Sequence, residues 1–453
     1  MRRQKFHITP TKGLLNDPNG LIFWNDEYHL FFQWNPHSCE HGSKYWAHLK
    51  SKDLVVWENL PPALSPESYY DKNGCYSGSA IEKDGMLYLV YTGNVKKNGI
   101  RESYQCLAKS ADGINFTKLG PIIDNKDIPK GYTKHFRDPK VLKKGDFYYL
   151  LLGAQRIDLT GTIVLYKSSD LFNWTFLGEV LKSNFGFMCE CPDYIEDSNL
   201  GALIFSPQGL TSKGDLYNNL YQSGYIIDDL NLPIQSSNFI ELDRGFEFYA
   251  PQTFLDKNNI NTLIAWMGMP EELNHPTISE ENWVHCLTIP REIQISNKKL
   301  YQRPHRNLKS LRKEKIILKN VLVNNFINLK KYGIQGETYE LILKVTDITC
   351  NFNINIRVGK NNKTVFTFDK NRGKIVFDRT ISGSGNGGIR KVKIENNKEV
   401  LFHFFVDYSS VELFINDGEE VFTGNIYPDS DAIDIQIESE QSFEISELEF
   451  YKI

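Results

Sequence analysis

Five short polar clusters, each placed directly before an apolar run, hold the residues that could do chemistry. Measured at their central residues, the clusters recur at steps of 60, 61, 52 and 59 residues. These central residues are Asp17, Ser77, Asp138, Glu190 and Tyr249. Equivalent positions of a repeating fold face one another across its axis. The spacing therefore predicts that the three carboxyl groups, far apart in sequence, meet at one pocket.

Three carboxyl groups held close together repel one another, so the cluster needs a chemical reason. Glycoside hydrolysis supplies one, because one carboxylic acid protonates the leaving oxygen while a second carboxylate attacks the sugar or activates water. Glu190 lies between two cysteines, and apolar surroundings with two nearby aspartates would raise its pKa and suit it to the acid role. Asp17, flanked by asparagines, would be hydrogen-bonded and ionised as the nucleophile, and Arg137 would keep Asp138 charged. Any one cluster taken alone is more typical of turn chemistry, but three of them in repeat register favour a shared site.

The elements that must position these clusters repeat with the same period. Each cluster precedes a short, aromatic-rich run bounded by turn residues, which is typical of a strand. The runs are centred on Leu30, Leu89, Leu150, Ile204 and Ile264. A Lys-Ser-x-Asp-x-x-x-aromatic pattern also begins at Lys50, Lys109 and Lys167. A period near 60 residues in an all-β segment predicts a five-bladed β-propeller, with a sandwich array or a large jelly roll as the alternative.

Composition changes once along the chain, near residue 310. All seven tryptophans lie at or before Trp283, and 17 of the 18 prolines lie at or before Pro304. Beyond a basic stretch, the sequence alternates as strands do, and an Asn-Asp-Gly turn follows Val411–Ile415. The predicted fold is therefore all-β. It has a propeller over residues 1–305, a linker over 306–315 and a β-sandwich over 316–453.

Composition also narrows the function classes. The 453 residues include 52 Lys and Arg against 56 Asp and Glu, a net charge of −4, which argues against a nucleic-acid partner. The chain has no apolar run of the roughly 18 residues that a membrane span needs. Seven cysteines cannot all pair, and no apolar leader follows the basic start. We therefore expect a cytoplasmic protein with no membrane partner, and the sequence leaves a homo-oligomer open.

The clusters and several neighbouring motifs together resemble glycoside hydrolase family 32, the β-fructofuranosidases. The resemblance covers almost the whole chain, and its specificity comes from the order of the motifs. The motifs are Asn16–Gly20, Phe32–Pro36, Tyr76–Ala80, Phe136–Pro139, Glu190–Asp193, Phe248–Gln252 and Ala265–Gly268, with Phe377–Arg379 and Val406–Glu412 in the second domain.

This resemblance implies a retaining double displacement. Asp17 would form the fructosyl-enzyme, Glu190 would act as acid and then base, and Asp138 would hold the fructosyl hydroxyl groups. The carboxyl groups of a retaining pair lie roughly 5–5.5 Å apart. The residues expected to bind the sugar are Asn16, Gln33, Trp46, Tyr76, Ser77, Arg137, Tyr249 and Trp266. No cofactor and no metal are predicted.

The loop from His37 to Trp46 resembles that of the family's intracellular members, which act on sucrose-6-phosphate. In this loop His41 and Lys44 would bind a phosphate dianion through charge-assisted hydrogen bonds, unless the loop is simply an exposed basic segment. The expected partner is thus a small sugar: sucrose-6-phosphate, sucrose or a short fructan. The alternatives are an exo-acting fructosidase, a five-bladed pentosan hydrolase and a non-catalytic carbohydrate-binding propeller.

Overall fold

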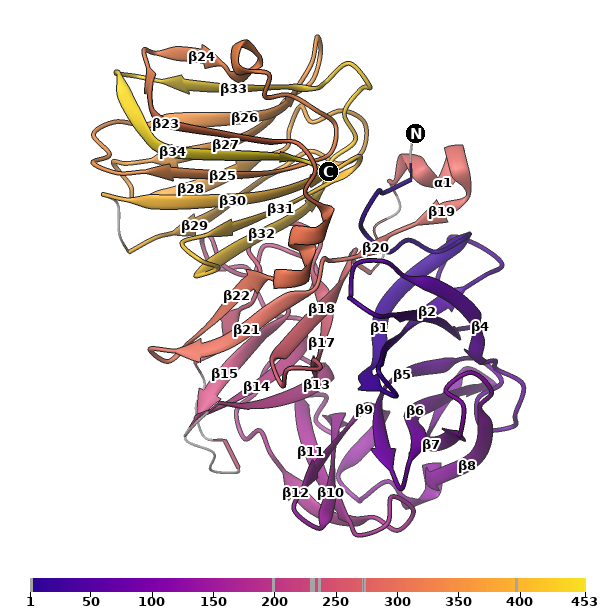
Figure 1. The fold of residues 1–453 in the computed structure, drawn as a ribbon. Coiled ribbons are helices and arrows are strands. Elements are labelled where there is room, and N and C mark those ends of the chain that lie inside the picture. Colours follow the sequence, from indigo (N-terminus) through magenta and orange to yellow (C-terminus); the bar gives the residue numbers. More distant parts are fainter. Residues whose placement is uncertain are drawn as a thin grey trace.

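Two bodies, both built almost entirely of strands, make up the chain in this computed structural model (Figure 1). The structure describes residues 3–197, 200–228, 233–234, 238–270, 272, 274–395 and 398–453. Its helices are short: η1 (Asn125–Asp127), α1 (Pro276–Glu281), η2 (Arg306–Leu311) and η3 (Leu329–Tyr332). In this part of the chain no helix has the length and apolar character needed to cross a bilayer.

Five sheets form the N-terminal body. The first sheet has β1 (Gly13–Trp24), β2 (Glu27–Asn35), β3 (Tyr45–Ser51) and β4 (Glu58–Leu64), and the second has β5 (Cys75–Lys83), β6 (Met86–Lys97), β7 (Ile100–Ser110) and β8 (Thr117–Ile123). The third has β9 (Tyr132–Lys144), β10 (Phe147–Arg156), β11 (Gly161–Ser168) and β12 (Thr175–Glu179). The fourth has β13 (Met188–Asp197), β14 (Leu200–Gln208), β15 (Gly224–Asp228) and β16 (Ile240–Glu241). The fifth has β17 (Tyr249–Leu255), β18 (Asn261–Met267), β21 (Arg291–Ser296) and β22 (Lys299–Pro304), with β20 (Cys286–Leu287) paired to β18.

The first strands of these sheets form a closed ring. β1 contacts β5, β5 contacts β9, β9 contacts β13, β13 contacts β17, and β17 returns to β1. β19 (Trp283–Val284) also pairs with β1 in parallel, which joins the end of the body to its beginning. The sheets are thus the five blades of a propeller, one for each 60-residue period.

The Lys-Ser-x-Asp repeat is the turn that follows the third strand of a blade. Ser168 ends β11, and its Oγ donates to Asp170 Oδ1 at 3.0 Å. Asp170 Oδ1 then accepts from two backbone N–H groups, those of Phe172 and Asn173, each at 2.8 Å. The indole of Trp174 donates to the Leu171 carbonyl at 2.9 Å, and Trp57 makes the equivalent bond, whereas the second repeat has Phe116 at this position. The same serine and aspartate bonds recur at Ser51 with Asp53 and at Ser110 with Asp112.

The C-terminal body is a sandwich of two six-stranded sheets. One sheet has β23 (Lys315–Val323), β34 (Phe443–Lys452), β25 (Tyr339–Val345), β30 (Val400–Asp407), β31 (Ser410–Ile415) and β32 (Glu420–Asn425). The other has β24 (Phe326–Asn328), β33 (Asp434–Ser439), β26 (Phe352–Val358), β27 (Thr364–Asp369), β28 (Lys374–Asp378) and β29 (Ile389–Lys393). Alternate residues of both sheets, such as Phe352, Ile354 and Ile356, fill one apolar core between them.

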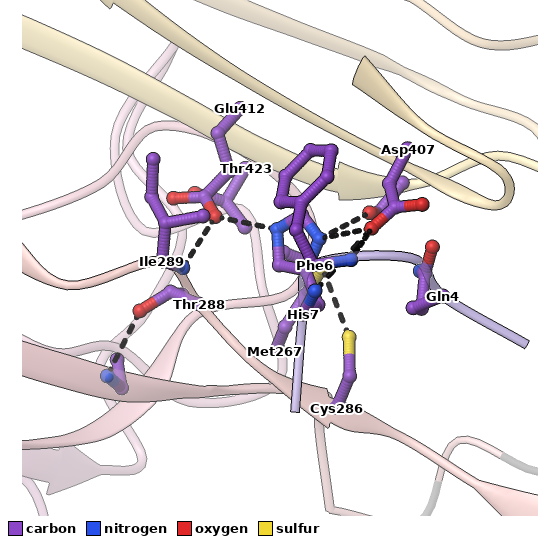
Figure 2. Close-up of polar contacts among 12 residues, drawn as sticks. Gln4, Phe6, His7, Met267, Cys286, Thr288, Ile289, Asp407, Glu412 and Thr423 are labelled. Carbon is purple, nitrogen blue, oxygen red and sulfur yellow. Dashed lines mark hydrogen bonds and ion pairs between the residues drawn. The ribbon is translucent and has the colours of Figure 1, made fainter. Parts of the chain in front are cut away.

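The two bodies meet through buried charges (Figure 2). His7 precedes β1, and its Nδ1 and Nε2 lie 2.9 Å from Asp407 Oδ2 and from Glu412 Oε1. Burial lowers the pKa of His7, but the hydrogen bonds and charges of Asp407 and Glu412 outweigh it and bring the pKa to about 9. The ring therefore donates from both nitrogens as an imidazolium. Arg291 in the fifth blade donates to Glu412 Oε2 at 2.6 Å, so one sandwich carboxylate holds both ends of the propeller.

Replacing His7 should destabilise the protein in a pH-dependent way. The folded pKa of about 9 lies above the unfolded value of about 6.5, so His7 stabilises the fold fully below pH 6.5 and loses this effect as the pH rises through 9. We expect His7→Gln to cost about 3–5 kcal/mol of unfolding free energy at pH 6 and distinctly less at pH 9.5. Urea unfolding at both pH values measures the difference. His403→Gln, at a half-buried histidine bonded to Glu340, is the matched control, and an equal loss at both pH values would contradict the assignment of a buried imidazolium.

Candidate active site

A cavity of about 500 Å³ lies where the first strands of the blades converge. Of the residues predicted to act on or bind a sugar, all but Ser77 and Trp46 line it. The lining residues are Asn16, Asp17, Gln33, His41, Gly42, Ser43, Lys44, Lys72, Asn73, Tyr76, Asn94, Lys96, Arg101, Arg137, Asp138, Glu190, Gln208, Tyr249, Trp266 and Pro270.

Each polar cluster sits on an irregularity of its first strand. Pairing with the second strand shifts register between Leu15 and Pro18, Tyr76 and Gly78, Arg137 and Lys140, Glu190 and Asp193, and Tyr249 and Gln252. Three non-glycine residues there have positive φ: Asp138 (63°), Cys191 (46°) and Ala250 (48°). Such bulges redirect side chains, and here they fall where the side chains reach the cavity. Past the bulge the strands resume regular pairing and bury their apolar runs, except that β1 shifts register once more between Asn19 and Ile22.

Asp17 is held by uncharged donors. Its Oδ2 accepts a hydrogen bond from Gln33 Nε2 at 3.0 Å and another from the Ser77 hydroxyl, and the Cys191 thiol lies 3.6 Å away. Its Oδ1 accepts one hydrogen bond, from Asn16 Nδ2 at 3.1 Å. The carboxyl group is therefore fixed in orientation, and Oδ1 is the less occupied oxygen.

Glu190 is held by a cation and a phenol. Arg137 donates to Glu190 Oε1 from Nε at 3.1 Å and from Nη2 at 2.7 Å, while Tyr249 donates to Oε2 at 2.7 Å. Arg137 Nε lies farther from Asp138, at 3.8 Å from Oδ2. Asp138 Oδ2 accepts instead from the Cys191 backbone N–H at 3.1 Å. Arg137 is adjacent in the chain to Asp138, and Cys191 is adjacent to Glu190. The Asp138 cluster therefore donates to Glu190 through Arg137, and the Glu190 cluster donates to Asp138 through the Cys191 N–H.

Burial raises the pKa of both aspartates. At Asp17 the hydrogen bond from Ser77 opposes this shift and the charge of Glu190 adds to it. At Asp138 burial raises the pKa to about 7, against the charge of Arg137 and together with the charges of Glu190 and Asp17. Arg137 does lower the pKa of Asp138, as expected, but its guanidinium group hydrogen-bonds Glu190 and the effect of burial on Asp138 is larger.

Two predicted sugar-binding residues, Ser77 and Trp46, do not line the cavity but are buried behind its wall. Ser77 is fully buried and positions Asp17. Trp46 is also fully buried, because it lies on β3, the third strand from the axis, and packs between the first two blades. Its indole donates to the Tyr76 carbonyl at 3.1 Å. The structure therefore corrects the expectation that Trp46 contacts the sugar, whereas Trp266 does line the cavity.

The predicted phosphate ligands, His41 and Lys44, line the cavity, but their surroundings disfavour the charged form of each side chain. Lys44 is buried, its Nζ donates to Asn16 Oδ1 at 2.8 Å, and burial lowers its pKa to about 7 against the charge of Asp17. His41 keeps an exposed face, yet desolvation by the surrounding protein and then the charge of Lys44 lower its pKa to about 4. At neutral pH His41 is therefore uncharged, and the Lys44 ammonium group is already hydrogen-bonded to Asn16.

Sequence reasoning missed the part of the cavity wall that the second blade supplies. Lys72, Asn73, Asn94, Lys96 and Arg101 line it. The turn before β5 and the β6–β7 hairpin carry these residues, outside the repeating clusters. The signal that could have found them is the polar Asn94–Lys97 stretch that ends an otherwise apolar strand. Among the described residues, no three His, Cys, Asp or Glu side chains gather as metal ligands would.

Comparison with known proteins agrees with this architecture. The family models described as "Glycosyl hydrolases family 32 N-terminal domain" and "Glycosyl hydrolases family 32 C terminal" match residues 7–304 and 307–452. The chain belongs to glycoside hydrolase family 32. The predicted family, the predicted fold class and the predicted enzyme class, a β-fructofuranosidase, are confirmed.

Individual relatives of this family 32 chain are similar over nearly its whole length. It is 43% identical to a sucrose-6-phosphate hydrolase of Bacillus subtilis, over 94% of this chain and 89% of that protein. A sucrose-6-phosphate hydrolase of Staphylococcus xylosus is 40% identical, over 97% and 90%. The solved sucrose-6-phosphate hydrolase of Lactobacillus gasseri superposes with a TM-score of 0.90 at 34% identity, over 99% and 93%. A family 32 β-fructofuranosidase of Bombyx mori gives 0.85 at 32% identity, over 100% and 94%.

Removing the carboxyl group of Asp138 should stabilise the fold. Its folded pKa of about 7 exceeds the unfolded value of about 3.9, so its ionisation destabilises the folded protein increasingly as the pH rises from 4 through 7. Asp138→Asn should therefore melt above the wild type at pH 8, by about 2–4 °C for each 1 kcal/mol relieved. The gain should shrink towards pH 4.5. Thermal unfolding at both pH values tests this, with Asp146→Asn, at an exposed carboxylate in the β9–β10 turn, as the control. A lower melting temperature at pH 8 would contradict it.

Proposed function

We propose that the chain hydrolyses the β-fructofuranosyl bond of sucrose-6-phosphate, and of sucrose, through a covalent fructosyl-enzyme. The observation that carries the proposal is the unequal setting of two carboxyl groups in one cavity. Neutral donors hold Asp17, whereas Arg137 and Tyr249 hold Glu190. Two carboxyl groups in different environments suit the separate roles of nucleophile and acid. The names of the similar proteins from Bacillus subtilis and Lactobacillus gasseri support the substrate.

Asp17 is the proposed nucleophile. Ser77 and Gln33 anchor Oδ2, so Oδ1, with one hydrogen bond, attacks the anomeric carbon of the fructosyl unit. The attack breaks the bond to the leaving oxygen and forms an ester with the sugar. Folding already fixes the orientation of this carboxylate. No further entropy is lost in orienting it during the reaction, so the reaction is faster.

Glu190 is the proposed acid and then base. Arg137 occupies its Oε1 with two N–H groups, so Oε2, beside the Tyr249 hydroxyl, is the oxygen that carries the proton. This proton passes to the leaving oxygen as the bond breaks. The resulting carboxylate then takes a proton from water, which attacks the ester and releases fructose.

Asp138 is proposed to bind the fructosyl hydroxyl groups. Its carboxyl oxygens accept hydrogen bonds from these hydroxyl groups. Asn16, Gln33, Tyr76, Arg137, Tyr249 and Trp266 complete this subsite, and Ser77 supports it from behind.

The proposed substrate also favours the cytoplasm, since a phosphorylated sugar is a substrate formed inside cells. All seven cysteines are free thiols, which a reducing compartment maintains. An exo-acting fructosidase of short fructans and a non-catalytic sugar-binding propeller are not favoured by the comparisons with sucrose-6-phosphate hydrolases. The domain division at 306–315 stays a prediction; β22 ends at Pro304 and β23 begins at Lys315.

Removing the nucleophile should abolish turnover without unfolding the protein. We expect Asp17→Ala to lower kcat by about 10⁴-fold or more, because no other described carboxyl group has the same set of donors. Release of fructose from sucrose and from sucrose-6-phosphate measures the loss, and circular dichroism checks the fold. Asp146→Asn should keep full activity. A folded Asp17→Ala protein with near-normal rates would overturn the assignment.

The protein should hydrolyse the phosphorylated sugar in preference to sucrose. We expect kcat/KM for sucrose-6-phosphate to exceed that for sucrose by about tenfold or more, as one or two charge-assisted hydrogen bonds would give. Inulin should be the poorest substrate. Initial rates on the three sugars, measured side by side, decide this, and the fastest rate on inulin would instead favour a fructan exohydrolase.

A further inference from the structure

Three cationic side chains that line the cavity have no ion-pair partner among the described residues, and two of them, Lys72 and Lys96, are exposed. Lys72, Lys96 and Arg101 all line the cavity, and all belong to the second blade or the turn before it. In the part of the chain that the structure describes, none of them forms a salt bridge or donates a side-chain hydrogen bond. The Arg101 guanidinium lies over the Tyr76 ring, with its central carbon 5.6 Å from the ring centre. The charges of Glu190 and Asp138 act on Arg101 from beyond ion-pair distance, so all three cations can still bind an anion that enters.

The backbone places two of these residues opposite each other and the third on a turn bonded to the same hairpin. Lys96 and Arg101 are direct cross-strand partners near the end of the β6–β7 hairpin. Like charges at such positions destabilise a sheet, so the arrangement has a cost that an anion between them would relieve. The turn that carries Lys72 is tied to the same hairpin. Asn73 Oδ1 accepts from the Lys96 N–H at 2.8 Å, and the Asn73 N–H donates to the Asn94 carbonyl at 3.1 Å.

The deeper cations of the cavity are already engaged. Arg137 is bound to Glu190 and Lys44 to Asn16. The deep part of the cavity also holds three carboxyl groups, which would repel a phosphate dianion. Charge thus changes sign along the cavity, from carboxylates at the floor to free cations at the rim.

The substrate has the matching polarity. In sucrose-6-phosphate the phosphate is attached to the 6-oxygen of the glucosyl unit, which is the leaving group. When Asp17 faces the fructosyl anomeric carbon, the glucosyl unit and its phosphate extend away from the floor. We propose that Lys72, Lys96 and Arg101 form the phosphate subsite and set the preference for sucrose-6-phosphate over sucrose. This inference rests on the proposed function and replaces the expectation that His41 and Lys44 bind the phosphate.

Charge-neutralising variants test the subsite. Lys96→Gln and Arg101→Gln should each lower the ratio of kcat/KM for sucrose-6-phosphate to that for sucrose by about tenfold. The triple variant with Lys72→Gln should lower it by about a hundredfold, through KM for the phosphorylated sugar. Lys97→Gln is the matched control, because Lys97 is the next residue of β6, is exposed and does not line the cavity. Its ratio should stay at the wild-type value.

A second measurement uses product inhibition of sucrose cleavage. The inhibition constant of glucose-6-phosphate should rise by about tenfold or more in the triple variant, while that of fructose should stay unchanged. A wild type that prefers sucrose-6-phosphate, together with a triple variant that keeps the same ratio and the same inhibition constant, would overturn the rim subsite and leave the proposed hydrolase standing. Equal wild-type kcat/KM for the two sugars would also overturn the subsite. A wild type that releases fructose from neither sugar would instead overturn the proposed function.

Discussion

Glu412 lies where three separate parts of the chain meet, and the arrangement of the two bodies depends on it. From β31 of the sandwich its carboxylate reaches His7, which precedes the first blade, and Arg291 of the fifth blade. It also accepts from the Ile289 N–H at 2.8 Å. All these groups are buried, so each charge is stable only while its partners are present. This contact, one of several ion pairs that dock the sandwich, therefore also holds the two ends of the propeller ring together.

Ring closure is in turn what makes the active site. Asp17 belongs to the first blade and Glu190 to the fourth, and no local interaction in the sequence could bring them to one cavity. The parallel pairing of β19 with β1 and the contact of β17 with β1 fix the first blade beside the fifth. Tyr249 of the fifth blade can then donate to Glu190, while Cys191 of the fourth approaches Asp17. None of the described residues of the sandwich lines the cavity, yet the sandwich contributes by keeping this ring closed.

The sequence predicted the features that recur with the blade period. It did not predict features that depend on contacts between side chains of different strands. Blades and the convergence of Asp17, Asp138 and Glu190 were predictable because each blade is a local unit of about 60 residues. The setting of Asp138 was not, since adjacency in the chain to Arg137 says nothing of where the guanidinium turns. Trp46 was misjudged because its strand lies third from the axis, a position that the motif does not record. Lys96 and Arg101 face each other only through the register of a hairpin.

Three departures from regular backbone structure fall in the polar clusters where the chemistry is done. Asp138, Cys191 and Ala250 adopt left-handed backbone conformations that cost free energy, and buried carboxyl groups add to that cost. Away from the cavity, the blades follow local rules closely, as in the turn of Ser168 and Asp170, whose every bond joins near neighbours. Such turns stabilise each blade without regard to the site. A propeller can therefore hold strained, repelling residues at its axis, because the free energy that fixes them comes from the regular outer strands and from the contacts that close the ring.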